Sequence, residues 1–338
     1  MTETAPPTEA PGRRKKKRGQ STPKWLLMIG YAVETVFYDV FTFVIRAIPV
    51  DRASDFGALV CVTFGPLTSV QKTVEQNLRI AFPEMPDAER RRLIRAQWEN
   101  TGRVFAEFPI MDRLTPASGR VEIINGERLD AIREAGRPVV FVSGHFANWE
   151  IMPATIVRYG VVCEMTYRAA NNPFVDKRIR DSRARYGVKL FAPKGGEGAR
   201  ELLDGMNRGA SVALMNDQKF NQGLAVPFFG HPVMTAPGPT RLALRFGTVL
   251  QPMSVTRLKG ARFRVVVEDP IELERTSDRS ADIEAGVRRV TEWIEARVRQ
   301  HPEDWFWVHK RWPNETYAAL ESGTLARSAS EPRRNGPG

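Results

Sequence analysis

Residues 138–150 read PVVFVSGHFANWE, and this stretch decides how the surrounding chain is expected to fold. The apolar run 138–142 predicts a buried strand, and the residues after it predict a turn into a helix. Residues five apart on one continuous helix point about 140° away from each other. His145 and Glu150 can therefore meet easily only if His145 lies in the turn and Glu150 in the first helical turn. This pattern is typical of a general base oriented by a carboxylate, and the alternative is a surface histidine beside an unrelated acid.

Strand and helix patterns alternate on both sides of this stretch. The expected strands are 121–124, 138–142, 161–167, 189–191, 211–215, 249–256 and 263–267. The expected helices are 54–67, 70–81, 87–108, 126–135, 151–159, 174–186, 198–208, 239–246 and 282–299. This alternation predicts an α/β domain with a mixed, largely parallel sheet flanked by helices.

The chain is strongly basic, and part of the charge is concentrated at its start. Residues 1–24 hold seven Lys or Arg against two Glu, which gives +5 and leaves +6 of the total of +11 for the rest. The chain is 42% hydrophobic, which excludes a disordered protein and predicts a large core. A positive folded part favours anionic partners. The two cysteines have no paired spacing and indicate reduced thiols in the cytoplasm, and the four histidines are not spaced like a metal-ligand set.

Residues 25–50 are almost wholly apolar and are long enough for a membrane-spanning helix. The polar residues of this segment fall within one sector of about 140° when the chain is drawn as a helix. They are Glu34, Thr35, Asp39, Thr42 and Arg46. The helix is therefore expected to lie in the membrane interface, or to pack this polar stripe against the rest of the protein. A buried helix of a soluble domain is the alternative.

The basic run 13–18 (RRKKKR) before this helix is typical of the cytoplasmic side of a membrane with anionic lipid. A nucleic-acid-binding arm is disfavoured, because no aromatic residues interleave the charges and no nucleic-acid motif follows. The predicted organisation is a disordered basic segment over 1–23, a membrane-anchoring helix over 24–52, an α/β domain over 53–318 and a disordered tail over 319–338.

Binding residues in sheets of this kind collect at the carboxyl ends of the strands. His145, Arg168, Lys194 and Asp217 each follow an expected strand. The sequence therefore predicts that several of these residues share one site. Taken singly, each can also be a solvated loop residue, and this interpretation is favoured for Lys194 and Lys219.

Five blocks occur in a fixed order along the chain: VEQNLRIAFPEM (74–85), GHFANWE (144–150), YRAANNP (167–173), MNDQKFNQGLAVPFFG (215–230) and WFWVHKRW (305–312). In this order they resemble the bacterial lipid A biosynthesis (lauroyl/myristoyl) acyltransferases, within the HX4D/E lysophospholipid-type acyltransferases. The resemblance implies a glycerol-3-phosphate acyltransferase-like fold on the cytoplasmic face of the inner membrane. It implies transfer of a fatty acyl chain from acyl carrier protein to a hydroxyl of an anionic glycolipid, a Kdo-bearing tetraacylated lipid A precursor, in lipopolysaccharide biosynthesis. No cofactor is expected beyond the acyl carrier protein thioester as co-substrate, no metal and no nucleic acid.

The resemblance also implies roles for individual residues. His145 would take the proton of the acceptor hydroxyl, and Glu150 would fix the imidazole tautomer. Backbone N–H groups near 146–148 are candidates for binding the oxyanion. The substrate-binding candidates are Arg168, Asp217, Asn148 and Lys219. Arg168 would hold a phosphate, and Asp217 would orient Arg168 or the acceptor hydroxyl.

Two other functions are compatible with these residues. In the first, the acceptor is a phosphatidylinositol mannoside or another glycolipid, and acyl-CoA is the donor. The second is a non-catalytic protein that binds membrane lipid or acyl carrier protein. It is disfavoured, because such a protein needs no general base.

The aromatic-basic block 305–312 is expected either to form an interfacial patch, or to pack in the core next to a polar helix end.

Overall fold

The computed structural model describes residues 23–167, 169–191 and 196–325. The strands in these ranges are β1 (Val121–Ile124), β2 (Val140–Ser143), β3 (Cys163–Thr166), β4 (Lys189–Phe191), β5 (Ser211–Met215), β6 (Leu224–Phe228), β7 (His231–Thr235), β8 (Leu250–Arg257) and β9 (Phe263–Val267). The strands β1-β9-β8-β2-β5-β3-β4 form a seven-stranded sheet in that order. Only the β8–β9 pair in this sheet is antiparallel among the described residues. The predicted mixed, largely parallel sheet is confirmed.

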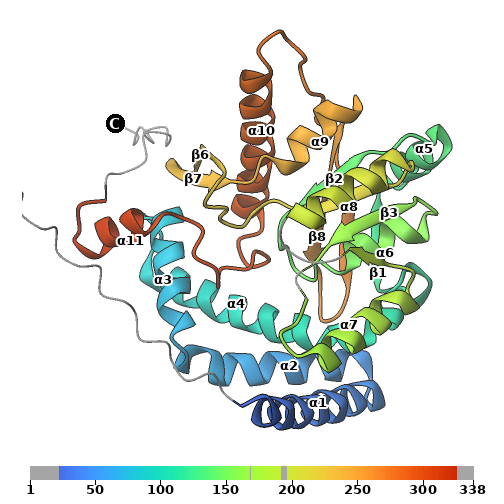
Figure 1. Cartoon of the computed structure of the whole chain (residues 1–338). Coiled ribbons are helices and arrows are strands. Elements are labelled where there is room, and N and C mark those ends of the chain that lie inside the picture. Colours follow the sequence, from blue (N-terminus) through green and yellow to red (C-terminus); the bar gives the residue numbers. More distant parts are fainter. Residues whose placement is uncertain (1–22, 168, 192–195, 326–338) are drawn as a thin grey trace, which may run out of the picture.

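Helices cover both faces of the sheet (Figure 1). The α-helices are α1 (Lys24–Ala47), α2 (Val50–Phe64), α3 (Val70–Ala81), α4 (Asp87–Glu107), α5 (Glu127–Ala135), α6 (Ile151–Arg158), α7 (Pro173–Arg185), α8 (Gly196–Asn207), α9 (Gly238–Phe246), α10 (Arg279–Gln300) and α11 (Asn314–Glu321). Short 3-10 turns lie at Gly65–Leu67, Phe108–Arg113 and Pro116–Ser118. Val140 and Val142 of β2 pack with α8, α9 and α10, and Phe141 packs with α5 and α6. A strand buried on both faces reads as a continuous apolar run, which is why 138–142 shows no alternation.

Helix α1 lies along one side of the molecule and attaches to it through the predicted polar stripe (Figure 1). Arg46 pairs with Asp112 at 2.8 Å and Asp39 pairs with Arg178. The side-chain amide of Asn172 donates to the Tyr31 carbonyl at 2.9 Å and to Glu34 at 3.0 Å. The opposite side of α1 is apolar and exposed, as at Phe37 (71% exposed) and Phe43 (75% exposed). The described residues include one helix long and apolar enough to cross a membrane, and it is α1.

Two of the expected domain boundaries differ in the structure. The helix expected to run to residue 52 ends at Ala47, because Pro49 disfavours helical geometry at Ile48, which is extended. The tail expected from residue 319 is not what the structure shows at 319–321, which belong to α11, whose Tyr317 is buried against α3. The β6–β7 hairpin and α11 were not expected from the sequence.

Candidate active site

His145 and Asp217 lie together at the carboxyl ends of two adjacent strands. Imidazole Nδ1 is 2.7 Å from Asp217 Oδ1, and the His145 backbone N–H donates to Asp217 Oδ2 at 2.8 Å. The register of β2 and β5 explains the contact, because Ser143 is paired with Met215 and the two residues lie two positions beyond that pair. Their meeting is thus a direct consequence of parallel pairing.

Gly144 permits this close approach. A β-carbon at residue 144 would lie 2.8 Å from the ring of Phe146 and 3.3 Å from Asp217 Oδ2. Ala147 then adopts a positive φ of 44°, which is uncommon for a residue other than glycine. The turn is held because the Ala147 N–H donates to the Asp304 carbonyl at 2.7 Å.

The segment after α10 completes the surroundings of Asp217. The indole N–H of Trp305 donates to Asp217 Oδ2 at 2.8 Å, and the Phe306 N–H donates to the His145 carbonyl at 3.1 Å. The imidazole ring also contacts the rings of Trp149 and Phe306. The role of Trp305 in holding this carboxylate has no signal in the sequence, because it depends on the fold of a distant segment.

The electrostatics favour a charged carboxylate beside a basic imidazole. Burial lowers the pKa of His145, but the charge and hydrogen bond of Asp217, with the charge of Glu150, outweigh it and raise this pKa above its usual value. Burial acts to raise the pKa of Asp217, but His145 and the indole N–H of Trp305 hold it far below its usual range. An Nδ1 proton directed at Asp217 leaves Nε2 able to accept a proton on the open side.

The expected contact between Glu150 and His145 is not what the structure shows. Glu150 accepts hydrogen bonds from Arg183 and from the Tyr186 hydroxyl, which is 3.0 Å away. Glu150 lies at the start of α6 and points toward α7, so the partner of the imidazole is the carboxylate of the next strand. Glu150 acts on His145 only through its charge.

Asn148 and two of the expected oxyanion donors are already engaged. The buried Asn148 amide donates to Glu107 at 2.9 Å, and its oxygen accepts the N–H of Glu150 at 3.2 Å. The N–H of Phe146 donates to the Gly144 carbonyl, and that of Ala147 to Asp304. Asn148 is therefore a structural residue here, and the prediction that Phe146 and Ala147 present open N–H groups is wrong.

The remaining substrate-binding candidates are placed as follows. Arg168 and Lys194 lie outside the described residues. Both oxygens of Asp217 contact groups of the chain itself: Oδ1 contacts the His145 imidazole, and Oδ2 accepts the N–H groups of the His145 backbone and the Trp305 indole. Lys219 is partly buried, two residues beyond Asp217. The side chain of Gln218 lies on the open side of the pair, with Nε2 3.5 Å from His145 Nε2.

A buried arginine holds the loop that carries Asp217 and Gln218. Arg311 is 2% exposed, and its guanidinium donates to the carbonyls of Gln218 at 3.1 Å and Met234 at 3.0 Å. Burial lowers its pKa to about 10. Trp305, Trp307 and Trp312 are also buried, so the interfacial-patch reading of 305–312 is wrong and the core-packing reading is confirmed. The expected polar helix end is absent there, because 308–313 contain no helix.

Comparison with known proteins finds similarity to acyltransferases. The family model described as bacterial lipid A biosynthesis acyltransferase matches residues 21–314. The phosphatidylinositol mannoside acyltransferase of Mycobacterium tuberculosis is 25% identical over 279 residues, 79% of this chain and 85% of that protein. The lipid A biosynthesis lauroyltransferase of Escherichia coli is 24% identical over 249 residues, 71% of this chain and 78% of that protein.

Among solved structures, the 1-acyl-sn-glycerophosphate acyltransferase of Thermotoga maritima aligns with a TM-score of 0.36 and 12% identity, covering 81% of this chain and 99% of that one. The family model spans most of the chain, including His145, Glu150 and Asp217. The chain therefore belongs to the bacterial lipid A biosynthesis acyltransferase family.

Proposed function

We propose that this acyltransferase moves a fatty acyl chain from an acyl carrier protein thioester to a hydroxyl of a lipid A precursor, with His145 as the general base. The observation that carries this proposal is the 2.7 Å contact between His145 Nδ1 and Asp217 Oδ1. It fixes one tautomer, stabilises the imidazolium that forms, and directs Nε2 toward the open side.

The chemistry proceeds in two proton transfers. His145 Nε2 takes the proton of the acceptor hydroxyl while the oxygen attacks the thioester carbonyl. The tetrahedral intermediate collapses, the carbon–sulfur bond breaks, and the imidazolium returns the proton to the departing thiolate. Ester and free thiol are the products, so atoms and charge balance.

No covalent acyl-enzyme is needed in this scheme. The hydroxyl nearest the histidine along the chain is Ser143, which is buried and donates to the Met253 carbonyl at 2.7 Å. Burial raises the pKa of Cys163, which disfavours a thiolate nucleophile. Gln218, whose amide lies beside His145 Nε2, is the side chain best placed to donate to the developing oxyanion.

A phosphatidylinositol mannoside acceptor is the second candidate, because the relatives of that name are 23–25% identical to this chain. Both candidate acceptors are glycolipids, and both place the reaction at a membrane. We propose the cytoplasmic face of the inner membrane, supported by the apolar outer side of α1 and by the basic run at 13–18.

The purified full chain should be given acyl carrier protein or CoA thioesters with either the Kdo-bearing tetraacylated lipid A precursor or a phosphatidylinositol mannoside, with mass spectrometry of the products. Acylation of the lipid A precursor from the carrier protein is the expected result. His145→Ala should lower the rate by about 10²–10⁴-fold. An unchanged rate in His145→Ala would refute the mechanism, and acylation of the mannoside alone from acyl-CoA would refute the assigned substrates.

A further inference from the structure

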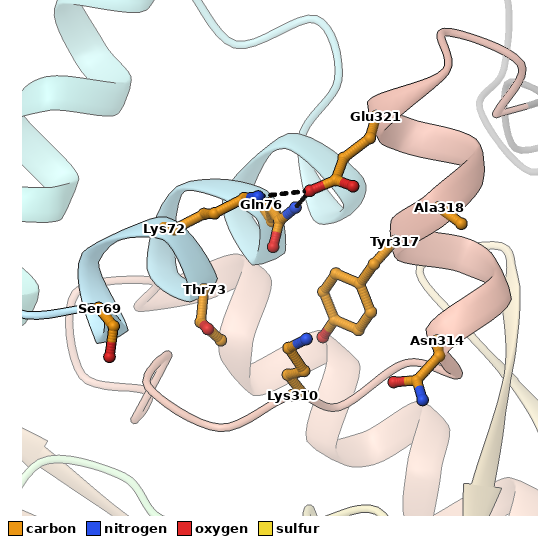
Figure 2. Close-up of a pocket in the computed structure, with 9 residues that line it drawn as sticks. All are labelled: Ser69, Lys72, Thr73, Gln76, Lys310, Asn314, Tyr317, Ala318 and Glu321. Carbon is orange, nitrogen blue, oxygen red and sulfur yellow. Dashed lines mark hydrogen bonds and ion pairs between the residues drawn. The ribbon is translucent and has the colours of Figure 1, made fainter.

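A polar cavity of about 450 Å³ lies between α3 and the carboxyl-terminal segment, and it shares no residue with the His145–Asp217 pair (Figure 2). Its lining residues are Ser69, Lys72, Thr73, Gln76, Lys310, Asn314, Tyr317, Ala318 and Glu321. Hydroxyl, amide and aromatic side chains are those that bind sugars, and lysines add affinity for an anion. The lining therefore matches an anionic sugar better than an acyl chain.

The lysines of this cavity are available to a ligand. Lys310 Nζ lies 5.1 Å from the centre of the Tyr317 ring, and none of the carboxylates in the described ranges is within ion-pair distance of it. Lys72 pairs with Glu321 at 2.7 Å, but both side chains are more than half exposed. Because such exposed pairs contribute little, Lys72 can exchange Glu321 for a ligand anion at small cost.

The cavity lies close to the apolar surface of the molecule. Its first lining residue, Ser69, lies two residues after Leu67 (79% exposed), in the 3-10 turn, and five after Phe64 (61% exposed), the last residue of α2. A lipid whose acyl chains enter the membrane beside α2 can place its headgroup at this position. A membrane lipid is therefore a better occupant than a free metabolite.

The cavity is also rigidly connected to the catalytic pair. The Tyr317 hydroxyl donates to the Asn77 side chain at 2.6 Å, and the Asn77 amide donates to the carbonyls of Trp307 at 2.6 Å and His309 at 2.8 Å. The same segment supplies Trp305 to Asp217. A headgroup held here has a fixed position relative to His145.

We propose that this cavity binds the anionic sugar headgroup of the membrane glycolipid that accepts the acyl chain. The proposal rests on the proposed function for the identity of the acceptor. It assigns the headgroup to α3 and α11, while the reacting hydroxyl lies at His145.

Two variants test the cavity by different means. Lys310→Gln removes the unpaired charge, and Ala318→Trp fills the space from an exposed position on α11. Lys259→Gln is the matched control, since Lys259 is an exposed lysine in the turn between β8 and β9 and does not line the cavity. The binding of each full-length protein is measured on phosphatidylcholine vesicles alone, with phosphatidylglycerol, with the lipid A precursor, or with phosphatidylinositol mannoside.

One of the two glycolipids should increase the affinity of the unaltered protein for vesicles. That increase should fall by about three- to tenfold in Lys310→Gln and Ala318→Trp, and persist in Lys259→Gln. In turnover assays the acceptor KM should rise by a similar factor, while kcat and the donor KM stay unchanged.

Several results would overturn the proposal. They are an unchanged glycolipid preference in both variants, the same Lys310-dependent gain with phosphatidylglycerol, and a rise in donor KM instead of acceptor KM. A second outcome separates the two proposals. If both cavity variants lose glycolipid binding but the unaltered protein transfers no acyl chain, the proposed function is refuted and the headgroup site is not. Normal transfer with an unaltered acceptor KM in both variants would refute the headgroup site alone.

Discussion

At the scale of single residues, the most direct test of the mechanism is to replace Asp217. Asp217→Asn keeps the size of the side chain but removes the charge that stabilises the imidazolium and selects its tautomer. We expect kcat, measured well below the melting temperatures of both proteins, to fall by about 10²–10⁴-fold. Asp181→Asn, which removes an exposed carboxylate of α7 paired with Lys177, is the control and should leave kcat unchanged. A kcat within twofold of the unaltered protein in Asp217→Asn would contradict the assignment.

The pH dependence follows from the same pair. Burial lowers the pKa of His145, but Asp217 and Glu150 raise it above 6.5 overall. A general base works when deprotonated, so kcat/KM should fall as the pH drops through this raised pKa. In Asp217→Asn burial remains and the neighbouring charge is gone, so the inflection of the residual activity should move to lower pH. A pH–rate profile of both proteins checks the direction, and an inflection that stays in place or moves upward would count against the pair.

Glu150 and Arg183 should act as one buried ion pair that stabilises the fold. Glu150 is 8% and Arg183 19% exposed at the side chain. Glu150→Gln leaves Arg183 without its partner and should cost about 3–5 kcal/mol of unfolding free energy. The double variant Glu150→Gln, Arg183→Gln should be clearly more stable than the sum of the two single variants predicts. Denaturant unfolding of the four proteins measures this coupling, and strict additivity would show that the pair makes no net interaction.

The site could be predicted from the sequence only where its chemistry is local. His145 was identified from its position after a strand, and Asp217 from the same rule. Their partnership was not identified, because it depends on β2 and β5 being neighbours, 72 residues apart in the chain. Within the GHFANWE stretch, Glu150 was the only visible carboxylate for His145. In the structure Glu150 forms an ion pair with Arg183 instead. The spacing of residues in the sequence could not show this pairing.

At the scale of elements, helices α2 and α4 cross at two glycines. A β-carbon on Gly57 would lie 2.2 Å from the Gly102 carbonyl oxygen, and one on Gly102 would lie 2.0 Å from that of Gly57. Gly57→Ala must therefore push two backbones apart and should cost about 1–3 kcal/mol of unfolding free energy. Gly30→Ala is the matched control, because nothing lies within 4 Å of that position on α1. It should be neutral or stabilising by up to about 1 kcal/mol in thermal unfolding, and equal losses in both variants would argue against the crossing.

Elements with a strong local pattern could be predicted, and those that depend on other parts of the chain could not. The bounds of β1, β5, β9 and α3 agree with the sequence expectation. The β6–β7 hairpin lies in a stretch rich in glycine and proline, where Phe228 and Phe229 are buried by the distant Trp312 and by α10. The burial of these two residues follows no period in the sequence. Tertiary packing, not local periodicity, therefore determines that β6 and β7 form.

At the scale of the whole molecule, the outer side of α1 is apolar and exposed, and we propose that this side contacts the membrane. Asn172, which follows β3, holds α1 at the same carboxyl edge of the sheet as the catalytic pair, and the apolar side of α1 is the side opposite this attachment. Vesicle binding should therefore depend on the exposed aromatic residues of α1.

Replacing Phe37 and Phe43 together by Ser should lower the partition coefficient onto anionic vesicles by about 10²–10⁴-fold, because each phenyl ring contributes about 1.5–3 kcal/mol when fully inserted. Val162→Ser is the control, since Val162 is 63% exposed but precedes β3 at the opposite edge of the sheet. Co-sedimentation with vesicles measures both. Activity on acceptor dispersed in detergent should persist in the double variant, because α1 still attaches through Arg46, Asp39 and Asn172. Equal partition of the double variant and the unaltered protein would show that another surface meets the membrane.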